Sequence, residues 1–233
     1  MLFRSGSLTM TGGTLAFTGE KRDNSAGAPL SNQADANATI TGGNLISEYT
    51  CVFSFGQLEI SNISLESETA YWNTVKVQGG TALLENVAIT TRLGGCLEAA
   101  GGNVTLVNCN FMQIVPDDEV SVWNSMCMAA SGGGTVTVKG GSYTSAQYGA
   151  YIFNSGGTIN IEDGTFVATE QVLRSDAGGK INVSGGMFTG DIYIQESVAS
   201  MVVTGGNYSV DVQEYCDSGY QCVAENNRYI VQE

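Results

Sequence analysis

The amino-acid sequence predicts an all-β protein: a single-domain, right-handed parallel β-helix solenoid of about nine coils with a short C-terminal β-hairpin cap. Two observations predict this fold. A short apolar pattern recurs nine times along the chain, and glycine makes up 31 of the 233 residues while proline makes up only 2. A pattern that returns every roughly 20 to 50 residues is typical of solenoids, in which each coil packs only on its neighbours.

The recurring pattern reads apolar-x-apolar-x-(Gly, Asn or Asp)-x-x-apolar, and its second apolar residue serves as a marker. Successive markers lie 30, 20, 24, 22, 32, 23, 22 and 20 residues apart. Apolar residues at every second position predict a strand with one buried face. Strands this short bury a continuous core only when successive coils stack in parallel. The nine markers are Met10, Ile40, Ile60, Leu84, Leu106, Val138, Ile161, Val183 and Val203.

The fifth position of the pattern predicts a tight turn, because it holds only glycine, asparagine or aspartate. These residues tolerate a positive φ, where the chain passes through a left-handed conformation. Three successive repeats carry Asn62, Asn86 and Asn108 at this position. We therefore expect these asparagines to stack as a ladder at a buried turn. Paired glycines, such as Gly79-Gly80 and Gly156-Gly157, predict a second bend before each strand.

The two ends of the chain depart from the repeat. We expect the β-helix to occupy residues 1–208 and a capping segment to occupy 209–233, with a hairpin that turns at Asn226-Asn227 and covers the edge of the last coil. The first coil begins almost at Met1 without a matching cap. The natural chain is therefore expected to continue upstream as part of a larger protein, or the polar insertion Glu20–Asn37 folds over this end.

The six cysteines allow two interpretations. Cys216 and Cys222 bracket a short loop that a disulfide would close, and the alternative is that they are two small buried residues. The other four fall inside or beside predicted strands, where we expect them in the core: Cys51, Cys96, Cys109 and Cys127. Their spacing lacks the paired C-x-x-C of a zinc site, so the sequence predicts neither a metal nor another cofactor.

A variable loop follows the last apolar position of each repeat, and stacking would place these loops on one side of the rod. Trp72 and Trp123 lie two coils apart, about 10 Å, a spacing at which both rings would stack on sugar rings. The alternative is that the two tryptophans pack their own loops onto the rod. The candidate ligand-binding residues are Tyr71, Trp72, Asn73, Arg92, Asp117, Asp118, Trp123 and Tyr148.

Charge and composition exclude several classes of function. The chain has 23 acidic and 9 basic residues, a net charge of −14, which disfavours nucleic acid and an anionic membrane surface. No apolar stretch reaches the roughly 18 residues of a membrane-spanning helix, so we expect no membrane insertion. Histidine is absent, which excludes Ser-His-Asp and Cys-His catalysis and zinc sites with histidine ligands.

A repeated Gly-Gly-x-Phe/Tyr unit ends at Tyr143, Phe166, Phe188 and Tyr208, with aspartate-glycine in place of the glycine pair before Phe166. The unit resembles the pectate-lyase-like superfamily of right-handed parallel β-helices. The tail Tyr215-Cys-Asp-Ser-Gly-Tyr220 is similar to that of secreted or wall-anchored surface proteins of gut Gram-positive bacteria. The resemblance implies an extracellular or cell-surface location and an association with glycans. It supplies no catalytic residues, because the clustered aspartates of the enzymes in this superfamily have no counterpart here.

We therefore expect a non-catalytic extracellular module, a stalk, adhesin or glycan-binding rod, with glycans or a host surface as partner. The alternative from another class is a polysaccharide lyase or glycoside hydrolase, for which residues 117–119 are the only dense acidic group and Arg92 is the nearest basic residue. A third possibility is a phage tail-spike fragment. Tail spikes trimerise, whereas we expect a monomer.

Overall fold

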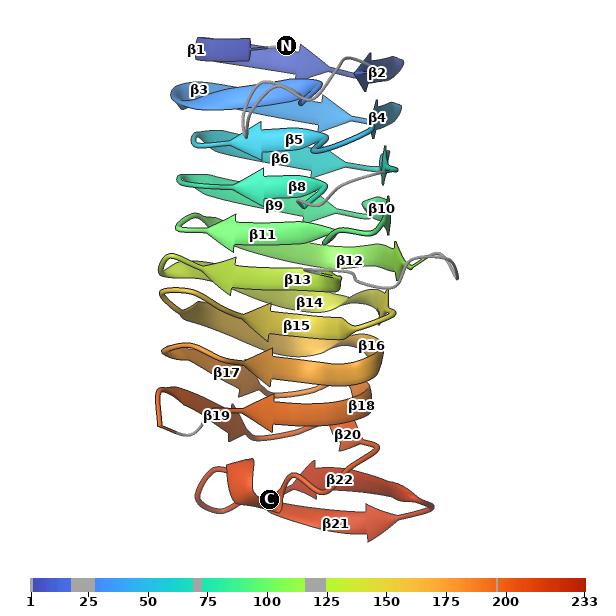
Figure 1. The fold of residues 1–233 in the computed structure, drawn as a ribbon, viewed down its shortest axis with the longest axis vertical. Helices are drawn as coiled ribbons and strands as arrows, with labels where there is room; N and C mark the ends of the chain where they lie inside the picture. The colour runs from blue at the N-terminus through green and yellow to red at the C-terminus, as the bar shows by residue number, and fades with distance from the viewer. Residues whose placement is uncertain (1, 18–27, 69–72, 116–124, 196) are drawn as a thin grey trace.

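The computed structural model describes residues 2–17, 28–68, 73–115, 125–195 and 197–233. It confirms an all-β parallel solenoid (Figure 1), in which the described strands form one connected sheet. The described ranges contain one helical element, the short 3-10 helix η1 (Gln213–Tyr215), and no helix long and apolar enough to cross a membrane. The solenoid has about seven turns, slightly fewer than the nine coils expected.

The strands stack in three parallel columns, with the apolar core between them. The first column contains β1 (Leu2–Met10), β3 (Leu30–Thr41), β6 (Gln57–Ser61), β9 (Thr81–Glu85), β12 (Asn103–Ile114), β14 (Gly134–Ser145), β16 (Gly157–Ser175), β17 (Gly179–Val183) and β19 (Ala199–Val203).

Long strands of the first column continue around the corner into the second. The second column contains β2 (Thr14–Phe17), β4 (Asn44–Ser47), β7 (Ser64–Ser67), β10 (Ala88–Arg92), later parts of β12, β14 and β16, then β18 (Met187–Ile194) and β20 (Asn207–Tyr208). The third column contains the start of β3, β5 (Val52–Ser54), β8 (Val75–Val77), β11 (Leu97–Ala100), β13 (Met126–Ser131), β15 (Tyr148–Ile152) and the ends of β16 and β18.

The register of the first column confirms the alignment of the repeats. Every pair of successive markers is a pair of register partners, from Met10 opposite Ile40 to Val183 opposite Val203. The polar insertion Glu20–Asn37, the alternative cover for the first coil, does not fold over it from residue 30 onward. There it forms β3, which pairs with both β1 and β5, because Leu30, Ser31 and Asn32 bury their side chains in the third column.

The positive φ predicted at the fifth position of the pattern is present in six of the nine repeats. In the last three repeats it occurs one residue later, at Gly164, Gly186 and Gly206, with φ of 131°, 105° and 107°. That part of the prediction is wrong. In these repeats the glycine after the fifth position takes the left-handed conformation, which it adopts without a Cβ clash.

The asparagine ladder is confirmed, but it lies on the surface rather than in a buried turn. Asn86 Nδ2 donates to Asn62 Oδ1 at 3.3 Å, and Asn108 Nδ2 donates to Asn86 Oδ1 at 2.9 Å. The three residues have φ of 54°, 52° and 50° in chain order. The residue after each asparagine points into the core, so the asparagine side chain is directed outward and is exposed.

Replacing Asn86 with alanine is expected to lower the free energy of unfolding by about 1–2 kcal/mol, because alanine pays the steric cost of a left-handed conformation. Asn86→Gly removes the same two ladder bonds but tolerates the positive φ, so it should cost less than about 1 kcal/mol. Urea unfolding of both variants and of the parent measures the difference. Equal losses in the two variants would show that the ladder bonds matter more than the backbone conformation.

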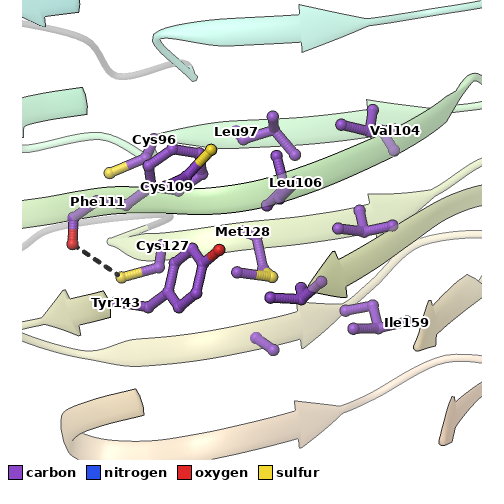
Figure 2. Packing of buried hydrophobic residues seen from close by; sticks show 14 of the residues in the cluster. Cys96, Leu97, Val104, Leu106, Cys109, Phe111, Cys127, Met128, Tyr143 and Ile159 are labelled. Carbon is purple, nitrogen blue, oxygen red and sulfur yellow. Dashed lines mark hydrogen bonds between the residues drawn. The ribbon is translucent and has the colours of Figure 1, made fainter. Parts of the chain in front are cut away.

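A column of five aromatic rings runs through the core along the second column of strands. The first ring meets the second edge-on at an interplanar angle of 90°, and the other four are stacked. Neighbouring ring centroids lie 5.3, 4.6, 5.1 and 4.8 Å apart. Tyr143 and Tyr208 donate their hydroxyls to the backbone carbonyls of Gly140 and Gly205, each at 2.9 Å, so the buried phenols are satisfied. The five rings belong to Phe111, Tyr143, Phe166, Phe188 and Tyr208, and Figure 2 shows the first two among their neighbours.

Four cysteines lie in the core as predicted: Cys51, Cys96, Cys109 and Cys127, each 0–1% exposed. Figure 2 shows three of them beside the rings, with the Cys127 thiol donating to the Phe111 carbonyl at 3.9 Å. Burial raises the pKa of Cys51 to about 12 and that of Cys109 to about 11. These side chains therefore stay protonated and serve as small apolar residues.

The C-terminal hairpin is confirmed. Strands β21 (Gln221–Glu225) and β22 (Arg228–Gln232) pair antiparallel and turn at Asn226 and Asn227, with φ of 50° and 61°. Strand β22 also pairs antiparallel with β20, so the hairpin covers the edge of the last coil. The cysteines of this segment fit neither interpretation in full: Cys216 and Cys222 are free thiols, and both are only partly buried. Partial burial raises the pKa of each thiol.

Candidate functional site

Five of the eight candidate residues, namely Tyr71, Trp72, Asp117, Asp118 and Trp123, lie outside the described residues. The tryptophan pair, and the acidic cluster behind the enzyme alternative, therefore remain predictions. The described candidates belong to different surfaces. Arg92 is exposed at the end of β10, opposite Ile114 in the second column, whereas Tyr148 begins β15 in the third column. Arg92 was expected in a loop, but the alternation of exposed and buried residues continues through it, and it lies in a strand.

Asn73 lies in the protein interior rather than on a binding surface. It is 3% exposed, and its Nδ2 donates to Glu98 Oε2 at 2.7 Å. The Glu98 carboxylate also accepts from Ser131 Oγ at 2.7 Å and lies 2.9 Å from the Lys76 ammonium. Asn73 therefore helps to hold a buried carboxylate, which corrects its prediction as a ligand-binding residue.

Tyr148 belongs to an aromatic cluster on the outward face of the third column, the face formed by β11, β13 and β15 in Figure 1. Along β15 the inward residues Ala150 and Ile152 are fully buried, so Tyr151 between them points outward. The Tyr148 and Tyr151 ring centroids lie 5.1 Å apart, and those of Tyr151 and Phe153 lie 5.2 Å apart.

Arg174 holds this cluster together from the next strand. It is the register partner of both Tyr151 and Tyr193. Its guanidinium carbon lies 4.6, 5.3 and 5.4 Å from the ring centroids of Tyr148, Tyr151 and Tyr193. These are cation–π distances. Tyr193 is 47% exposed and presents the most open ring of the group.

Hydrogen bonds fix the orientation of the guanidinium. Arg174 Nε donates to both Asp176 carboxylate oxygens at 3.0 Å, and one Nη donates to Asp176 Oδ2 at 2.8 Å. The other Nη donates to the Tyr148 hydroxyl at 3.1 Å and to Gln171 Oε1 at 2.9 Å. The Tyr151 hydroxyl donates to Asp176 Oδ2 at 2.6 Å. We call this group the tyrosine platform: Tyr148, Tyr151, Phe153, Gln171, Arg174, Asp176 and Tyr193.

The pKa shifts of Tyr148, Tyr151 and Arg174 keep these three groups in their ordinary protonation at neutral pH. Burial raises the pKa of Tyr148, and burial together with the hydrogen bond to Asp176 raises the pKa of Tyr151. Desolvation lowers the pKa of Arg174, but its hydrogen bond and charge interaction with Asp176 outweigh this and raise it. The platform therefore offers neutral phenols and a guanidinium whose charge Asp176 balances, an arrangement suited to binding by ring faces and fixed hydrogen-bonding groups.

Most of the platform was missed in the sequence, although a signal for it exists. Side chains alternate between the two faces of a strand. In Tyr151-Ile152-Phe153 the two rings therefore share one face, and in Ile192-Tyr193-Ile194 the ring lies on the face opposite the two isoleucines. Arg174 and Asp176 show the same alternation around the buried Ser175. Aligning the outward positions of the third column between repeats places Tyr151, Arg174 and Tyr193 in one line.

A shallow pocket of about 280 Å³ lies on the first column. Its polar groups include Asn182, whose Nδ2 donates to Asn160 Oδ1 at 2.7 Å. No aromatic ring lines it, so it lacks a stacking surface: its lining residues are Asn160, Ile161, Glu162, Asn182, Val183, Ser184, Val202 and Thr204. Within the described part of the chain, no group of three or more cysteine, aspartate or glutamate side chains is arranged to hold a metal ion.

Comparison with known proteins adds no family or relative to the fold described above. No protein-family model matches the chain, no curated protein matches it, and no solved structure matches it. The resemblance to the pectate-lyase-like superfamily, and the bacterial surface setting that it implies, therefore stay predictions, whereas the parallel β-solenoid itself is established by the strand register.

Proposed function

We propose that the chain is a non-catalytic glycan-binding module in which the tyrosine platform binds sugar rings. The observation that supports this is the exposed ring of Tyr193, 47% exposed, beside a guanidinium held at 5.4 Å from its centroid. A sugar ring carries C–H groups on its faces and hydroxyls on its rim. The platform has matching parts: aromatic faces for the C–H groups, and Gln171, Asp176 and tyrosine hydroxyls for the rim.

The scaffold favours such binding because it is rigid. Five platform residues lie on β15, β16 and β18, strands that pair in parallel with their neighbours, and Phe153 and Asp176 directly follow the ends of β15 and β16. Their side chains are already held by the contacts to Arg174, so a ligand orders little on binding and loses little affinity to conformational entropy.

On this proposal the chain acts outside the cell or at its surface, as a rod that presents the platform to glycans, including those of a host surface. The acidic net charge of −14 keeps such a rod soluble and separate from nucleic acid. A single copy carries every residue of the platform, so a monomer is sufficient for binding.

Replacing Tyr193 with alanine is expected to weaken glycan binding by about tenfold, or about 1.4 kcal/mol, because the open stacking surface is lost. Printed glycan arrays find the ligand, and titration calorimetry then measures the affinity. Tyr193→Phe keeps the ring and should keep most of the affinity. Val223→Ala changes a 36% exposed apolar residue in the cap and should have no effect. Unchanged affinity in Tyr193→Ala would exclude the platform as the binding site.

A further inference from the structure

We infer that the tyrosine platform selects uncharged glycans and holds them parallel to the rod axis, with about one sugar residue per coil. This inference rests on the proposed glycan-binding function and adds the ligand class and its orientation. Three observations carry it: the hydrogen bonds of the only cation in the platform, the charges around it, and the register of the strands.

The cation of the platform is already used within the protein. Arg174 directs Nε and one Nη to the Asp176 carboxylate, and its other Nη to Tyr148 and Gln171. A sugar carboxylate is best bound by two parallel N–H groups of one guanidinium. Both edges of the Arg174 fork are engaged, so the platform has no such pair to offer an acidic sugar.

The charges beside the platform are acidic. Asp191 is exposed and is the register partner of Gln171. Glu170 is exposed next to Gln171 and accepts a hydrogen bond from Gln147 Nε2 at 3.2 Å. Because Asp176 balances Arg174, these two carboxylates leave the surroundings negative, in line with the net charge of −14. Uronic, sialic and sulfated sugars would be repelled, whereas neutral sugars would not.

The strand register gives the direction of the ligand. Tyr151, Arg174 and Tyr193 are register partners in adjacent strands, so they form a line along the rod axis. Tyr148 and Gln171 begin a second line beside it. Adjacent strands are about 4.8 Å apart, close to the length of one sugar residue in an extended β-linked chain. A glycan parallel to the axis would therefore meet equivalent positions once per residue.

The test compares neutral and acidic oligosaccharides on the whole chain. A printed array of neutral and acidic glycans is screened first. The neutral probes are then β-1,4-linked oligomers of glucose, mannose and N-acetylglucosamine, about two to six residues long. The acidic probes are oligomers of glucuronic and galacturonic acid of equal length. We expect the best neutral series to bind at least about tenfold more tightly than any acidic one at low salt. Affinity should rise with length and then level off once the oligomer spans the three strands.

Salt provides an independent readout. Raising it from about 0.01 M to about 1 M shortens the Debye length from about 30 Å to about 3 Å, so the preference for neutral oligomers should shrink. Tighter binding of an acidic series would overturn this inference while leaving glycan binding intact. Absence of binding to every glycan on the array would overturn the proposed function itself.

A variant should weaken the preference for neutral oligomers if the inference is correct. Asp176→Asn removes the counter-charge of Arg174, so affinity for uronate oligomers should rise by about tenfold relative to the parent chain. Glu225→Gln makes the same change in net charge on the exposed β21 strand of the cap and should leave the preference unchanged. If Asp176→Asn retains its β-sheet circular dichroism and its preference for neutral oligomers, the role of the balanced charge is refuted. The comparison on the parent chain decides the matter should that variant not fold.

Discussion

Replacing Phe166 with alanine is expected to lower the free energy of unfolding by about 3–5 kcal/mol. Phe166 is 0% exposed and is the central ring of the aromatic column. Its centroid lies 4.6 Å from that of Tyr143 and 5.1 Å from that of Phe188. Alanine would lose the buried area, two ring contacts and the close packing of a core whose strands are held in register and cannot collapse into the space.

Denaturant unfolding followed by far-ultraviolet circular dichroism measures this loss. Val167→Ala is the matched control, because Val167 is the next residue, points outward and is 38% exposed. It should change stability by no more than about 0.5 kcal/mol. Phe166→Leu keeps part of the buried volume and should fall between the two. A loss below about 1 kcal/mol in Phe166→Ala would show that the ring column is not a continuous packed element.

The Phe166→Ala substitution should also lower the cooperativity of unfolding. Coils of a solenoid contact only their neighbours, so stability depends on the interfaces between adjacent coils. Phe166 contributes to two such interfaces, those with Tyr143 and Phe188. Weakening both should separate the unfolding of the two ends of the rod, which a lower denaturant m-value reports.

The register of the first column could be predicted from the sequence because equivalent positions of the repeat become partners in neighbouring strands. Met10 and Ile40 are 30 residues apart yet are direct partners, since an insertion between strands lengthens a connection without moving the strand. The exact turn residue could not be predicted from the same pattern. At Asp163-Gly164 either residue tolerates a positive φ, and it is the glycine, which has no Cβ, that adopts it.

The candidate site was harder to predict, because it depends on which side chains from different coils meet. The buried position of Asn73 follows from its hydrogen bond to Glu98, a residue of the next coil, and the carboxylate of Glu98 is also bound by Ser131 from the coil after that. Nothing in the local sequence around Asn73 indicates these partners. The outward line from Tyr151 through Arg174 to Tyr193 was accessible in principle, because it follows from period-2 alternation once the third column is aligned.

Replacing Glu98 with alanine is expected to destabilise the chain by about 3 kcal/mol. Glu98 lies on the same outward line as Tyr151 but is only 4% exposed. Alanine would remove the carboxylate that lies 2.9 Å from the Lys76 ammonium and would leave the Asn73 amide and the Ser131 hydroxyl without their acceptor. Burial makes each of these losses larger than on the surface, because water does not replace the missing partner.

The surface ion pair between Lys139 and Glu162 provides a matched comparison. Its side chains are 50% and 53% exposed and its charged atoms are 3.9 Å apart, so Glu162→Ala should change stability by less than about 1 kcal/mol. Urea unfolding of both alanine variants measures the contrast. Similar losses at Glu98 and Glu162 would contradict the structure, because they would mean that the Glu98 carboxylate is solvated.

The double variant Lys76→Met with Glu98→Leu separates the two sources of the loss at Glu98. If the cost arises from stranding polar partners of a buried charge pair, replacing both charges with apolar side chains should recover most of the stability lost in Glu98→Ala. If the carboxylate instead organises the local backbone through Asn73 and Ser131, the double variant should stay as unstable as the single one. We expect recovery, because β8 and β11 pair through their backbones at this position whatever the side chains are.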